Sequence, residues 1–580
     1  MYLFNCYNIV ISFSFLIFMF QWHIANTNGM YALKERDRKS RSAFRPVFCV
    51  VFFFISICGL ILRLLFLQAN RNLTAADVSE RFVQVDSSRG YIYDRNLLPL
   101  VNDTAENTAV TLLPGADGGT AAARVAIRAF QPYGIKADTL KVKDACVLFE
   151  TEKEIPQTET AVNIKRVVRY GTDNVCRHLI GYLDADGHGV CGIEKSFDRL
   201  LMESKGSVGV RYYADAEGRA LIGKALRVDD RNYNDPAGVV LTIDRRLQKI
   251  ADSAMKSAGI EKGAAVILDV ADSAILASVS VPEYRLDDME RALTDPALPY
   301  LNRALEAYPV GSVFKPFVAA AAIDRSVSTD GVFRCEGSIG VDGEVFGCFQ
   351  RNAHGEMDLN KAVCNSCNTY FIDLGSRVGA EALLSTARAF GFGSPIDLTG
   401  QIHCASGNLP EKDALSLPAA LANFSFGQGD LLAAPLQLAA AYGALARGGA
   451  YKPPYLMKAV VNKELHETAY YLPESGQTAA QTSTCRRICE SLRENMLSGT
   501  GVQGRSPYVT AAGKTATAQT GDFDENGKER LCTWFCGFFP YETPRYVVVV
   551  FNEDGSTAAE DCAPVFREIS ARICRAVPND

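Results

Sequence analysis

The chain has 580 residues, which at roughly 150 residues per domain predicts three to four folding units. Charged residues make up 22% and hydrophobic residues 48%, a globular composition that excludes wholesale disorder. With 60 basic and 66 acidic residues there is no general excess of positive charge, so no nucleic-acid partner is predicted. The 6 His are scattered along the chain, and we predict neither a cofactor nor a metal site. The 17 Cys are too few for a small disulfide-built protein.

A long apolar segment near the N-terminus predicts a membrane anchor. Residues 47–67 are apolar except mainly for Arg63, and at 1.5 Å per residue they cross a hydrocarbon core of about 30 Å. A buried core helix is the structural alternative. Basic residues lie ahead of the segment at Lys34, Arg36, Arg38, Lys39, Arg41 and Arg45. Since basic flanks stay in the cytoplasm, we predict a cytoplasmic tail over 1–46, a single-pass transmembrane helix over 47–67, and an extracytoplasmic remainder.

A second apolar run, residues 9–20, is short for a span and lacks a basic region ahead of it. Met30 is an alternative start, which would leave a short basic tail and one anchor. Either interpretation puts the C-terminal bulk outside the cell membrane.

The exterior part is predicted to hold two domains. Residues 70–235 read as short strands and loops with one Ala-rich helix over 120–130, and 229–238 reads as a polar linker. In 236–580, strands are predicted at 239–243, 264–269, 274–279, 509–519, 533–539 and 546–551, and helices at 245–258 and through much of 309–449. Strands, then helices, then strands predict an α+β fold, an antiparallel sheet flanked by helices plus an all-helical part.

The first reactive pair is Ser312 and Lys315, at the start of a predicted apolar helix after a tight Pro and Gly entry. Residues three apart share one helix face, about 5–6 Å apart at Cβ. A neutral amine can accept the serine proton when burial and nearby positive charge lower its pKa. The helix N-terminus also offers N–H groups to a developing oxyanion.

Two further motifs follow. Ser366 and Asn368 offer a hydroxyl for proton relay and an amide for a peptide carbonyl. Lys514, Thr515 and Thr517 lie on a predicted strand, where alternation puts the lysine on one face and both threonines on the other. A strand at a cleft can bind an extended peptide, and the lysine adds positive charge for a carboxylate.

Each motif alone has a structural alternative. Ser253 and Lys256 repeat the first spacing in a polar helix, and Ser406 and Asn408 repeat the second in a turn. The three motifs in this order are far more specific than any one of them, because together they form a known catalytic set.

On these motifs the chain resembles the penicillin-binding proteins, specifically the monofunctional class B transpeptidases of the division and sporulation type. Further segments that resemble the family lie at 89–96, 189–198, 241–244, 302–304, 426–429 and 435–437. The resemblance implies that 70–235 is a pedestal or dimerisation domain and 236–580 the transpeptidase domain. It also implies peptidoglycan stem peptides as substrates, acylation by β-lactams, and a partner glycosyltransferase in the same membrane.

The resemblance further assigns roles to the motif residues. Ser312 attacks the penultimate D-Ala carbonyl, Lys315 is the base for acylation, and Ser366 shuttles a proton toward the leaving amine. Asn368 holds the substrate peptide, and Lys514, Thr515 and Thr517 bind its terminal carboxylate. The N–H groups of Ser312 and Thr517 form the oxyanion hole.

One position departs from the family: Ala516 stands where the family usually has Gly. Its methyl is predicted on the Lys514 face, where it would narrow the cleft, alter β-lactam affinity or slow turnover. No reactive group is lost, so the prediction of catalysis stands.

Other features are weaker. Residues 522–527 mimic the start of a calcium loop, but the twelfth position is Thr533 and a charged hairpin turn is the better interpretation. Cys485 and Cys489 lack metal-binding partners at suitable spacing and are predicted to be buried or paired thiols. A disulfide between Cys335 and Cys348 is a further hypothesis.

Two other classes of function remain open on the sequence. A D,D-carboxypeptidase or β-lactamase would use the same motifs with water as the acceptor. A β-lactam sensor or a catalytically idle scaffold of the division machinery would use them for binding alone.

Overall fold

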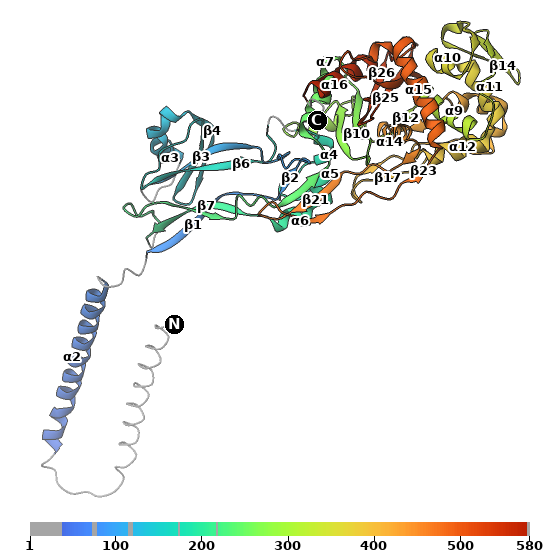
Figure 1. Cartoon of the computed structure of the whole chain (residues 1–580). Helices are drawn as coiled ribbons and strands as arrows, with labels where there is room; N and C mark the ends of the chain where they lie inside the picture. Colours follow the sequence, from blue (N-terminus) through green and yellow to red (C-terminus); the bar gives the residue numbers. More distant parts are fainter. Residues whose placement is uncertain (1–37, 72–77, 114–119, 172–174, 216–217, 577–580) are drawn as a thin grey trace, which may run out of the picture. The chain divides into compact units, whose positions relative to one another are not determined.

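The computed structural model describes residues 38–71, 78–113, 120–171, 175–215 and 218–576 (Figure 1). The apolar run 9–20, both candidate start residues, and Lys34 and Arg36 lie outside the described residues. The chain divides into two compact units. The first holds the N-terminal segment up to Ser79 with 214–216, and the second holds 80–213 and 217–580.

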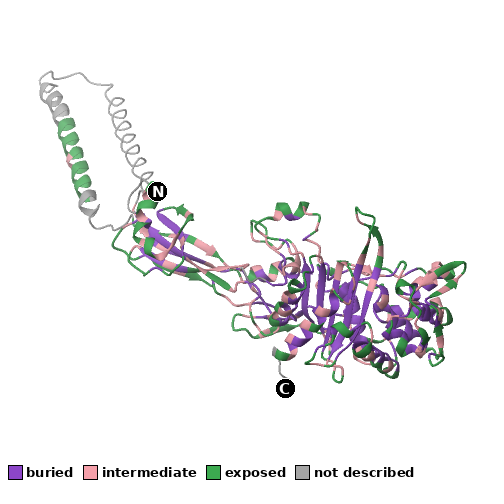
Figure 2. Ribbon diagram, turned by 90° about the horizontal axis from the view of Figure 1, so that it is seen from above, coloured by how far each residue is buried: buried purple, intermediate pink, exposed green. Residues whose placement is uncertain are grey.

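The described part of the first unit is chiefly one helix, α2 (Arg38–Arg71). Its stretch Phe48–Phe66 is the one helical segment, within the described residues, that is long and apolar enough to cross a membrane. The side chains of this stretch are almost all exposed, as Figure 2 shows in green, which fits a helix whose partner is lipid. The helix therefore fits a single-pass membrane anchor, in agreement with the span predicted at 47–67.

The second unit begins with two small sheets. A four-stranded antiparallel sheet has the order β4-β5-β3-β6, and a three-stranded sheet has the order β1-β7-β8. The strands are β1 (Ser79–Ser87), β3 (Thr104–Leu112), β4 (Ile135–Lys143), β5 (Cys146–Thr151), β6 (Ala161–Val168), β7 (Ser207–Ala214) and β8 (Arg227–Arg231). The predicted helix at 120–130 is confirmed as α3 (Thr120–Ala126) followed by the 3-10 helix η1 (Ile127–Tyr133), and both pack on the four-stranded sheet.

A buried ion network joins two segments that resembled the family. Glu194, in α5 (Gly192–Ser196), is fully buried and accepts a hydrogen bond from Arg89 Nε at 3.0 Å. Arg169 binds the same carboxylate with Nε and Nη2 at 2.8 and 2.9 Å. Two guanidinium groups satisfy the carboxylate, which without them would be an uncompensated buried charge. The short helices α4 (Arg177–Ile180) and α6 (Asp198–Glu203) precede and follow α5 in the chain, and Asp198 of α6 accepts from Arg89 Nη2 at 2.8 Å.

One sheet links the segment at 89–96 with the start of the predicted transpeptidase domain. In the order β2-β9-β21-β22, strand β2 (Tyr91–Tyr93) pairs in parallel with β9 (Gly238–Leu241). Strand β21 (Met457–Val461) pairs with β9, and β22 (Glu467–Tyr470) pairs with β21, both antiparallel. The predicted linker at 229–238 is partly strand, because β8 continues to Arg231. Residues on both sides of the predicted boundary at 235/236 belong to one compact unit, so that boundary stays a prediction.

The central sheet confirms the predicted antiparallel α+β core. Its order is β11-β10-β26-β25-β24, with all neighbours antiparallel. The strands are β10 (Gly263–Asp269), β11 (Ile275–Val281), β24 (Ala512–Phe523), β25 (Glu529–Phe539) and β26 (Tyr546–Gly555). Alternate β26 residues enter two different cores: Val547 and Val549 face one, and Val548 and Val550 the other.

Helices cover both faces of this sheet. On one face lie α7 (Arg245–Ser257) and α16 (Cys562–Ala576), and on the other lie α9 (Lys315–Asp324), α14 (Pro435–Ala446) and most of α15 (Thr482–Ser498). Figure 2 shows the strands between them as buried. The remaining elements of this part are the helices α8 (Met289–Thr294), α10 (Leu359–Cys364), α11 (Asn368–Val378), α12 (Ala380–Ala389) and α13 (Pro418–Ser425) and the short strands β12 (Tyr308–Pro309), β17 (Ile396–Asp397), β18 (His403–Cys404), β19 (Leu432–Ala433), β20 (Ala450–Tyr451) and β23 (Gln477–Thr478).

The prediction of a helix-dominated stretch over 309–449 was wrong at 333–357. Two hairpins occupy this segment: β13 (Phe333–Cys335) pairs with β16 (Gly355–Met357), and β14 (Ser338–Val341) pairs with β15 (Glu344–Gly347). Asp342 and Gly343 connect β14 to β15 with positive φ angles of 51° and 86°, the backbone that an Asp-Gly hairpin turn requires. We call residues 333–357 the hairpin segment.

Candidate active site

Backbone hydrogen bonds hold the turn that carries Ser312, one before the serine and one after it. Ser312 lies in the 3-10 helix η2 (Gly311–Phe314), which leads directly into α9, and the Lys315 N–H donates to the Ser312 carbonyl. The Gly311 N–H donates to the Gly427 carbonyl at 2.8 Å. A Cβ on Gly427, whose φ is +88°, would lie only 2.0 Å from the Gly311 oxygen, so a side chain there is excluded. The resembling segment 426–429 thus fixes the backbone just before the serine.

Lys315 is fully buried and joins the first motif to the second. Its Nζ donates to the Ser366 carbonyl at 2.7 Å, to Ser366 Oγ at 3.2 Å and to Asn368 Oδ1 at 2.7 Å. Burial lowers the pKa of this lysine from 10.5 to about 7, although Cys367 and Cys348 nearby act to raise it. A lysine with this pKa exchanges its proton near neutral pH, as a general base must.

The hydroxyl of Ser312 is half-buried, and within the described residues it makes no hydrogen bond. Ser312 and Lys315 nevertheless lie on one helical turn, as predicted. Hydrogen bonds between catalytic groups are often long before substrate binds, so this geometry is compatible with Ser312 and Lys315 acting as a pair.

The second motif lies in the turn between α10 and α11. Ser366 has a φ of +52°, and Cys367 is the N-cap position of α11. Asn368 orients its amide by two contacts of opposite kind: Oδ1 accepts from Lys315, and Nδ2 donates to the Gly347 carbonyl at 2.9 Å. The amide therefore connects the buried lysine to the hairpin segment.

The third motif lies on β24, an edge strand that pairs, within the described residues, with β25 alone. Lys514 is fully buried, and its Nζ donates to the Thr515 carbonyl at 2.9 Å and to Thr500 Oγ1 at 3.3 Å. Burial, reinforced by the charge of Lys315, holds the pKa of Lys514 well below 10.5. Thr517 is half-buried, and its Oγ1 accepts from the Ala558 N–H at 3.4 Å.

Sequence reasoning missed Thr500 and Asn495. Thr500 Oγ1 accepts from Thr515 Oγ1 at 2.7 Å and donates to Asn495 Oδ1 at 3.2 Å. Asn495, fully buried in α15, donates to the Gly513 carbonyl at 2.8 Å. The signal was the Ser-Gly-Thr-Gly run at 498–501 after a long helix, where a Cβ on Gly499 would lie 2.4 Å from Asn495 Oδ1.

Ala516 lies on the Lys514 face, as predicted, but its methyl is only 3% exposed. A Cβ built on Gly311 would lie 3.4 Å from the Ala516 Cβ. The methyl therefore packs against the turn that carries Ser312, and it does not project into an open cleft.

The weaker candidates are structural, as predicted. Ser253 Oγ accepts from Arg572 at 2.9 Å, and Lys256 pairs with Asp252 one turn away. Ser406 donates to the neighbouring Gly407 carbonyl at 3.1 Å. Residues 524–528 form the β24–β25 turn, closed by the Asp524 N–H to the Lys528 carbonyl at 2.9 Å.

The cysteine predictions divide. Cys485 and Cys489 are buried free thiols of α15, in agreement with the sequence. The hypothesis of a disulfide between Cys335 and Cys348 was wrong for this structure. Both are free thiols with Sγ atoms 3.7 Å apart, against about 2.05 Å in a disulfide.

Comparisons with known proteins agree with this geometry. The family model of the penicillin binding protein transpeptidase domain matches residues 263–571. The peptidoglycan D,D-transpeptidase MrdA of Haemophilus influenzae is 28% identical over 474 residues, covering 72% of this chain and 70% of that protein. The peptidoglycan D,D-transpeptidase PbpA of Mycobacterium tuberculosis is 31% identical over 383 residues, covering 60% of this chain and 75% of that protein.

Solved structures share the fold. The crystal structure of PBPA from Mycobacterium tuberculosis matches with a TM-score of 0.59 at 25% identity, over 70% of this chain and 93% of that chain. A chain of a peptidoglycan synthase complex, described as coordinating polymerization and crosslinking, matches with a TM-score of 0.67 at 23% identity, over 91% of this chain and 98% of that chain. On the family match and these relatives, the protein belongs to the penicillin-binding protein transpeptidase domain family.

Proposed function

We propose that the protein is a class B peptidoglycan D,D-transpeptidase that cross-links stem peptides through a serine acyl-enzyme on Ser312. The observation that carries the proposal is the state of Lys315. It is fully buried, its pKa is lowered to about 7, and it lies one helical turn from Ser312 and in hydrogen-bond contact with Ser366 and Asn368. Burying an amine costs desolvation free energy, and a lysine with a lowered pKa beside other reactive side chains is typical of a functional site.

In the acylation step, Ser312 Oγ attacks the carbonyl carbon of the penultimate D-Ala. The hydroxyl proton passes to the neutral amine of Lys315. The new Oγ–C bond forms, and the peptide C–N bond then breaks. The leaving amine of the terminal D-Ala takes a proton by way of the Ser366 hydroxyl, which already contacts Lys315 Nζ at 3.2 Å.

Two N–H groups are proposed to bind the oxyanion of this step. The Ser312 N–H lies in the first turn of η2, where helix N–H groups have no partner within the helix. The Thr517 N–H lies on the edge strand β24. One such donor contributes roughly 2.7–4 kcal/mol to lowering the barrier.

Lys514, Thr515 and Thr517 are proposed to bind the terminal carboxylate, with Asn368 holding the peptide. The free edge of β24 offers unpaired backbone groups to an extended stem peptide. The amine of a second stem peptide then resolves the acyl-enzyme and forms the cross-link. A β-lactam would imitate the donor and leave Ser312 acylated.

The topology and partners are also part of the proposal. The helix at Phe48–Phe66 anchors the chain once in the cell membrane, with the basic flank inside and the catalytic domain outside. Residues 70–235 form the pedestal and 236–580 the transpeptidase domain. A glycosyltransferase in the same membrane supplies glycan strands, as the name of the structurally similar peptidoglycan synthase complex indicates for that assembly.

Cross-linking of lipid-linked peptidoglycan by the purified full chain tests the proposal. We expect dimeric stem peptides with the native chain and none with Ser312→Ala, which also loses covalent attachment of a fluorescent penicillin. Trimmed peptides without dimers would identify a D,D-carboxypeptidase. Penicillin attachment without turnover of peptides would identify a sensor or scaffold, and rapid hydrolysis of the penicillin a β-lactamase.

A further inference from the structure

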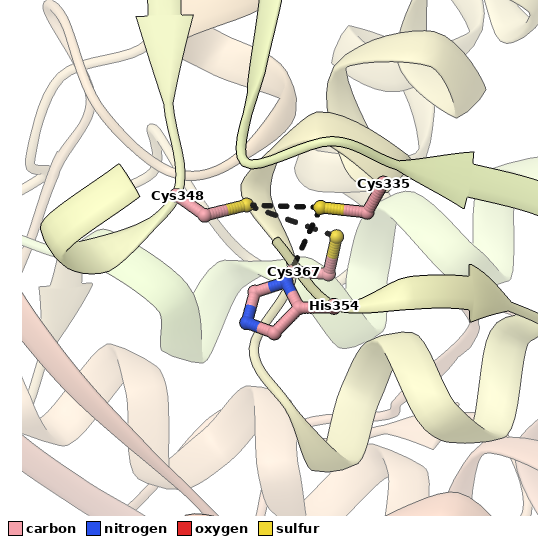
Figure 3. A group of neighbouring side chains, drawn as sticks. All are labelled: Cys335, Cys348, His354 and Cys367. Atoms are coloured by element: carbon pink, nitrogen blue, oxygen red, sulfur yellow. Dashed lines mark hydrogen bonds between the residues drawn. The ribbon is translucent and has the colours of Figure 1, made fainter. Parts of the chain in front are cut away.

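Four side chains with metal-binding atoms point toward one another (Figure 3). One of them, Cys367, lies between Ser366 and Asn368 of the second motif. The four are Cys335 at the end of β13, Cys348 after β15, His354 before β16, and Cys367 at the N-cap of α11. Their donor atoms all lie within 4.8 Å of one another. The three cysteines are at most 5% exposed, and the histidine is half-buried.

The spacing of these atoms fits a tetrahedral ion. With Zn–S bonds of about 2.3 Å and a Zn–N bond of about 2.05 Å, tetrahedral edges are about 3.8 Å between sulfurs and about 3.5 Å between sulfur and nitrogen. Cys348 Sγ lies 3.7 Å from Cys335 Sγ and 3.8 Å from Cys367 Sγ. His354 Nδ1 lies 3.3 Å from Cys335 Sγ. One ion can therefore contact all four atoms with small shifts.

Neighbouring groups support thiolate ligands. The Gly337 N–H donates to Cys335 Sγ at 3.4 Å, and Thr369 Oγ1 lies 3.3 Å from Cys367 Sγ. Such outer contacts orient metal ligands and stabilise their negative charge. Gly337 has a φ of +90°, and a Cβ there would lie 2.3 Å from the Arg351 carbonyl, so the turn that presents its N–H requires glycine.

We propose that Cys335, Cys348, His354 and Cys367 bind one structural Zn²⁺ ion. Three thiolates and one imidazole in tetrahedral reach are a ligand set that zinc prefers. All four positions would be filled by the protein, which leaves none for water or substrate, so the ion has no direct role in chemistry.

A metal cross-link would stabilise the hairpin segment. It consists of two-stranded hairpins, which are marginally stable alone, and it exposes Val345 and Phe349 at 63% and 68%. Three of the four ligands lie in this segment, and Cys367 is the N-cap of α11. The ion therefore fastens the hairpins to the start of that helix.

This placement makes the zinc site a positioning device for the acylation network. Cys367 lies between Ser366 and Asn368, the two residues that contact Lys315. Cys348 follows Gly347, whose carbonyl accepts from Asn368 Nδ2. Loss of the ion would release Cys367, which precedes Asn368 in the chain, and Cys348, which holds the Gly347 carbonyl in place. Asn368 would then lose both constraints on its position at once. Metal binding itself does not depend on the proposed transpeptidase activity.

The first experiment measures the metal content of the full chain purified in detergent without chelators. We expect about one zinc atom per chain, and X-ray absorption with sulfur near 2.3 Å and nitrogen near 2.0 Å. Cys348→Ser and His354→Ala are expected to lower the zinc content at least tenfold. Cys404→Ser, which removes an equally buried thiol outside the cluster, should leave it unchanged. Iron in place of zinc, zinc-free native protein, or a disulfide between Cys335 and Cys348 in alkylated peptides would overturn the proposal.

The second experiment tests the positioning role on the native chain, so it does not depend on folding of a variant. Removal of zinc by a chelator should slow acylation by a fluorescent penicillin roughly 10–100-fold and lower the Tm, and added Zn²⁺ should restore both. Zinc-free protein that keeps its acylation rate would refute the positioning role. The metal content is read separately, so failure of the transpeptidase proposal would not affect the first experiment.

Discussion

The pKa of Lys315 predicts a steep pH dependence of acylation. If the neutral amine takes the Ser312 proton, the rate follows the fraction of Lys315 that is unprotonated. With a pKa of about 7, roughly half of the lysine is neutral at pH 7, against about 0.03% for a lysine at 10.5. Burial therefore raises the reactive fraction at neutral pH by a factor on the order of 1,500.

The assay is the second-order rate constant for attachment of a fluorescent penicillin to the full chain between about pH 5 and pH 9. We expect a tenfold rise per pH unit below about pH 7 and a plateau above it. A fall should follow at alkaline pH, at a value below 10.5, as Lys514 loses the charge that binds the carboxylate. The Tm measured at each pH separates loss of chemistry from loss of folded protein.

Two results would refute this reasoning. A rate that stays flat between about pH 5 and pH 8 would show that no group with the lowered pKa limits acylation. A rate that is still rising tenfold per pH unit at about pH 9 would show that Lys315 titrates like a solvated lysine. In Lys315→Met the rising limb should disappear along with most of the rate, and its survival would assign the limb to another group.

Three substitutions test other parts of the site. Thr500→Val removes the hydroxyl that contacts both Lys514 and Thr515 while keeping the shape of the side chain. It should raise the acylation barrier by roughly 1–3 kcal/mol, which slows penicillin acylation about 5- to 150-fold, whereas Thr520→Val farther along β24 should leave the rate unchanged. A Thr500→Val rate equal to that of the native chain would exclude Thr500 from the site. Gly427→Ala should lower both the Tm and the acylation rate because its Cβ meets the Gly311 carbonyl. Gly343→Ala has a similar φ but open space around its Cβ, and should cost only about 1–2 kcal/mol of stability and leave the acylation rate unchanged. Equal losses in the two variants would show that the Gly427 contact does not hold the Ser312 turn in place. Ala516→Gly should lower the free energy of unfolding by about 0.5–1 kcal/mol, as should the control Ala518→Gly on the same face of β24. The rate of penicillin acylation should change little in both variants. A large increase in that rate in Ala516→Gly would mean that the methyl obstructs the cleft.

The central sheet and the three motifs could be predicted because their signals are local. Apolar runs such as 546–551 are long enough to identify as strands, and each motif keeps its reactive residues within a few positions. The family resemblance then supplied the order in which distant motifs meet. The contacts of Lys315 with Ser366 and Asn368 agree with that expectation.

The hairpin segment and the cluster of thiols could not be predicted in the same way. The strands of the segment are three or four residues long, too short for a reliable period of two. The cluster has 12 residues between Cys335 and Cys348 and again between His354 and Cys367, and the one close Cys-x-x-Cys pair that includes a member, Cys364 with Cys367, brings in a thiol from outside the cluster. Thr500 was missed for a related reason, because only tertiary packing places it beside Lys514.

The parallel pairing of β2 with β9 restricts how the enzyme can be divided. A recombinant fragment that begins at residue 236 would lack β2, so β9 would become an edge strand. Its backbone N–H and C=O groups beside the buried Val239 and Val240 would then be unpaired and exposed to solvent. It would also lose Asp94, whose carboxylate accepts from the Arg245 N–H at the start of α7. The smallest soluble piece that retains native behaviour should therefore include residues from about 80 onward, even though the reactive groups all lie beyond 311.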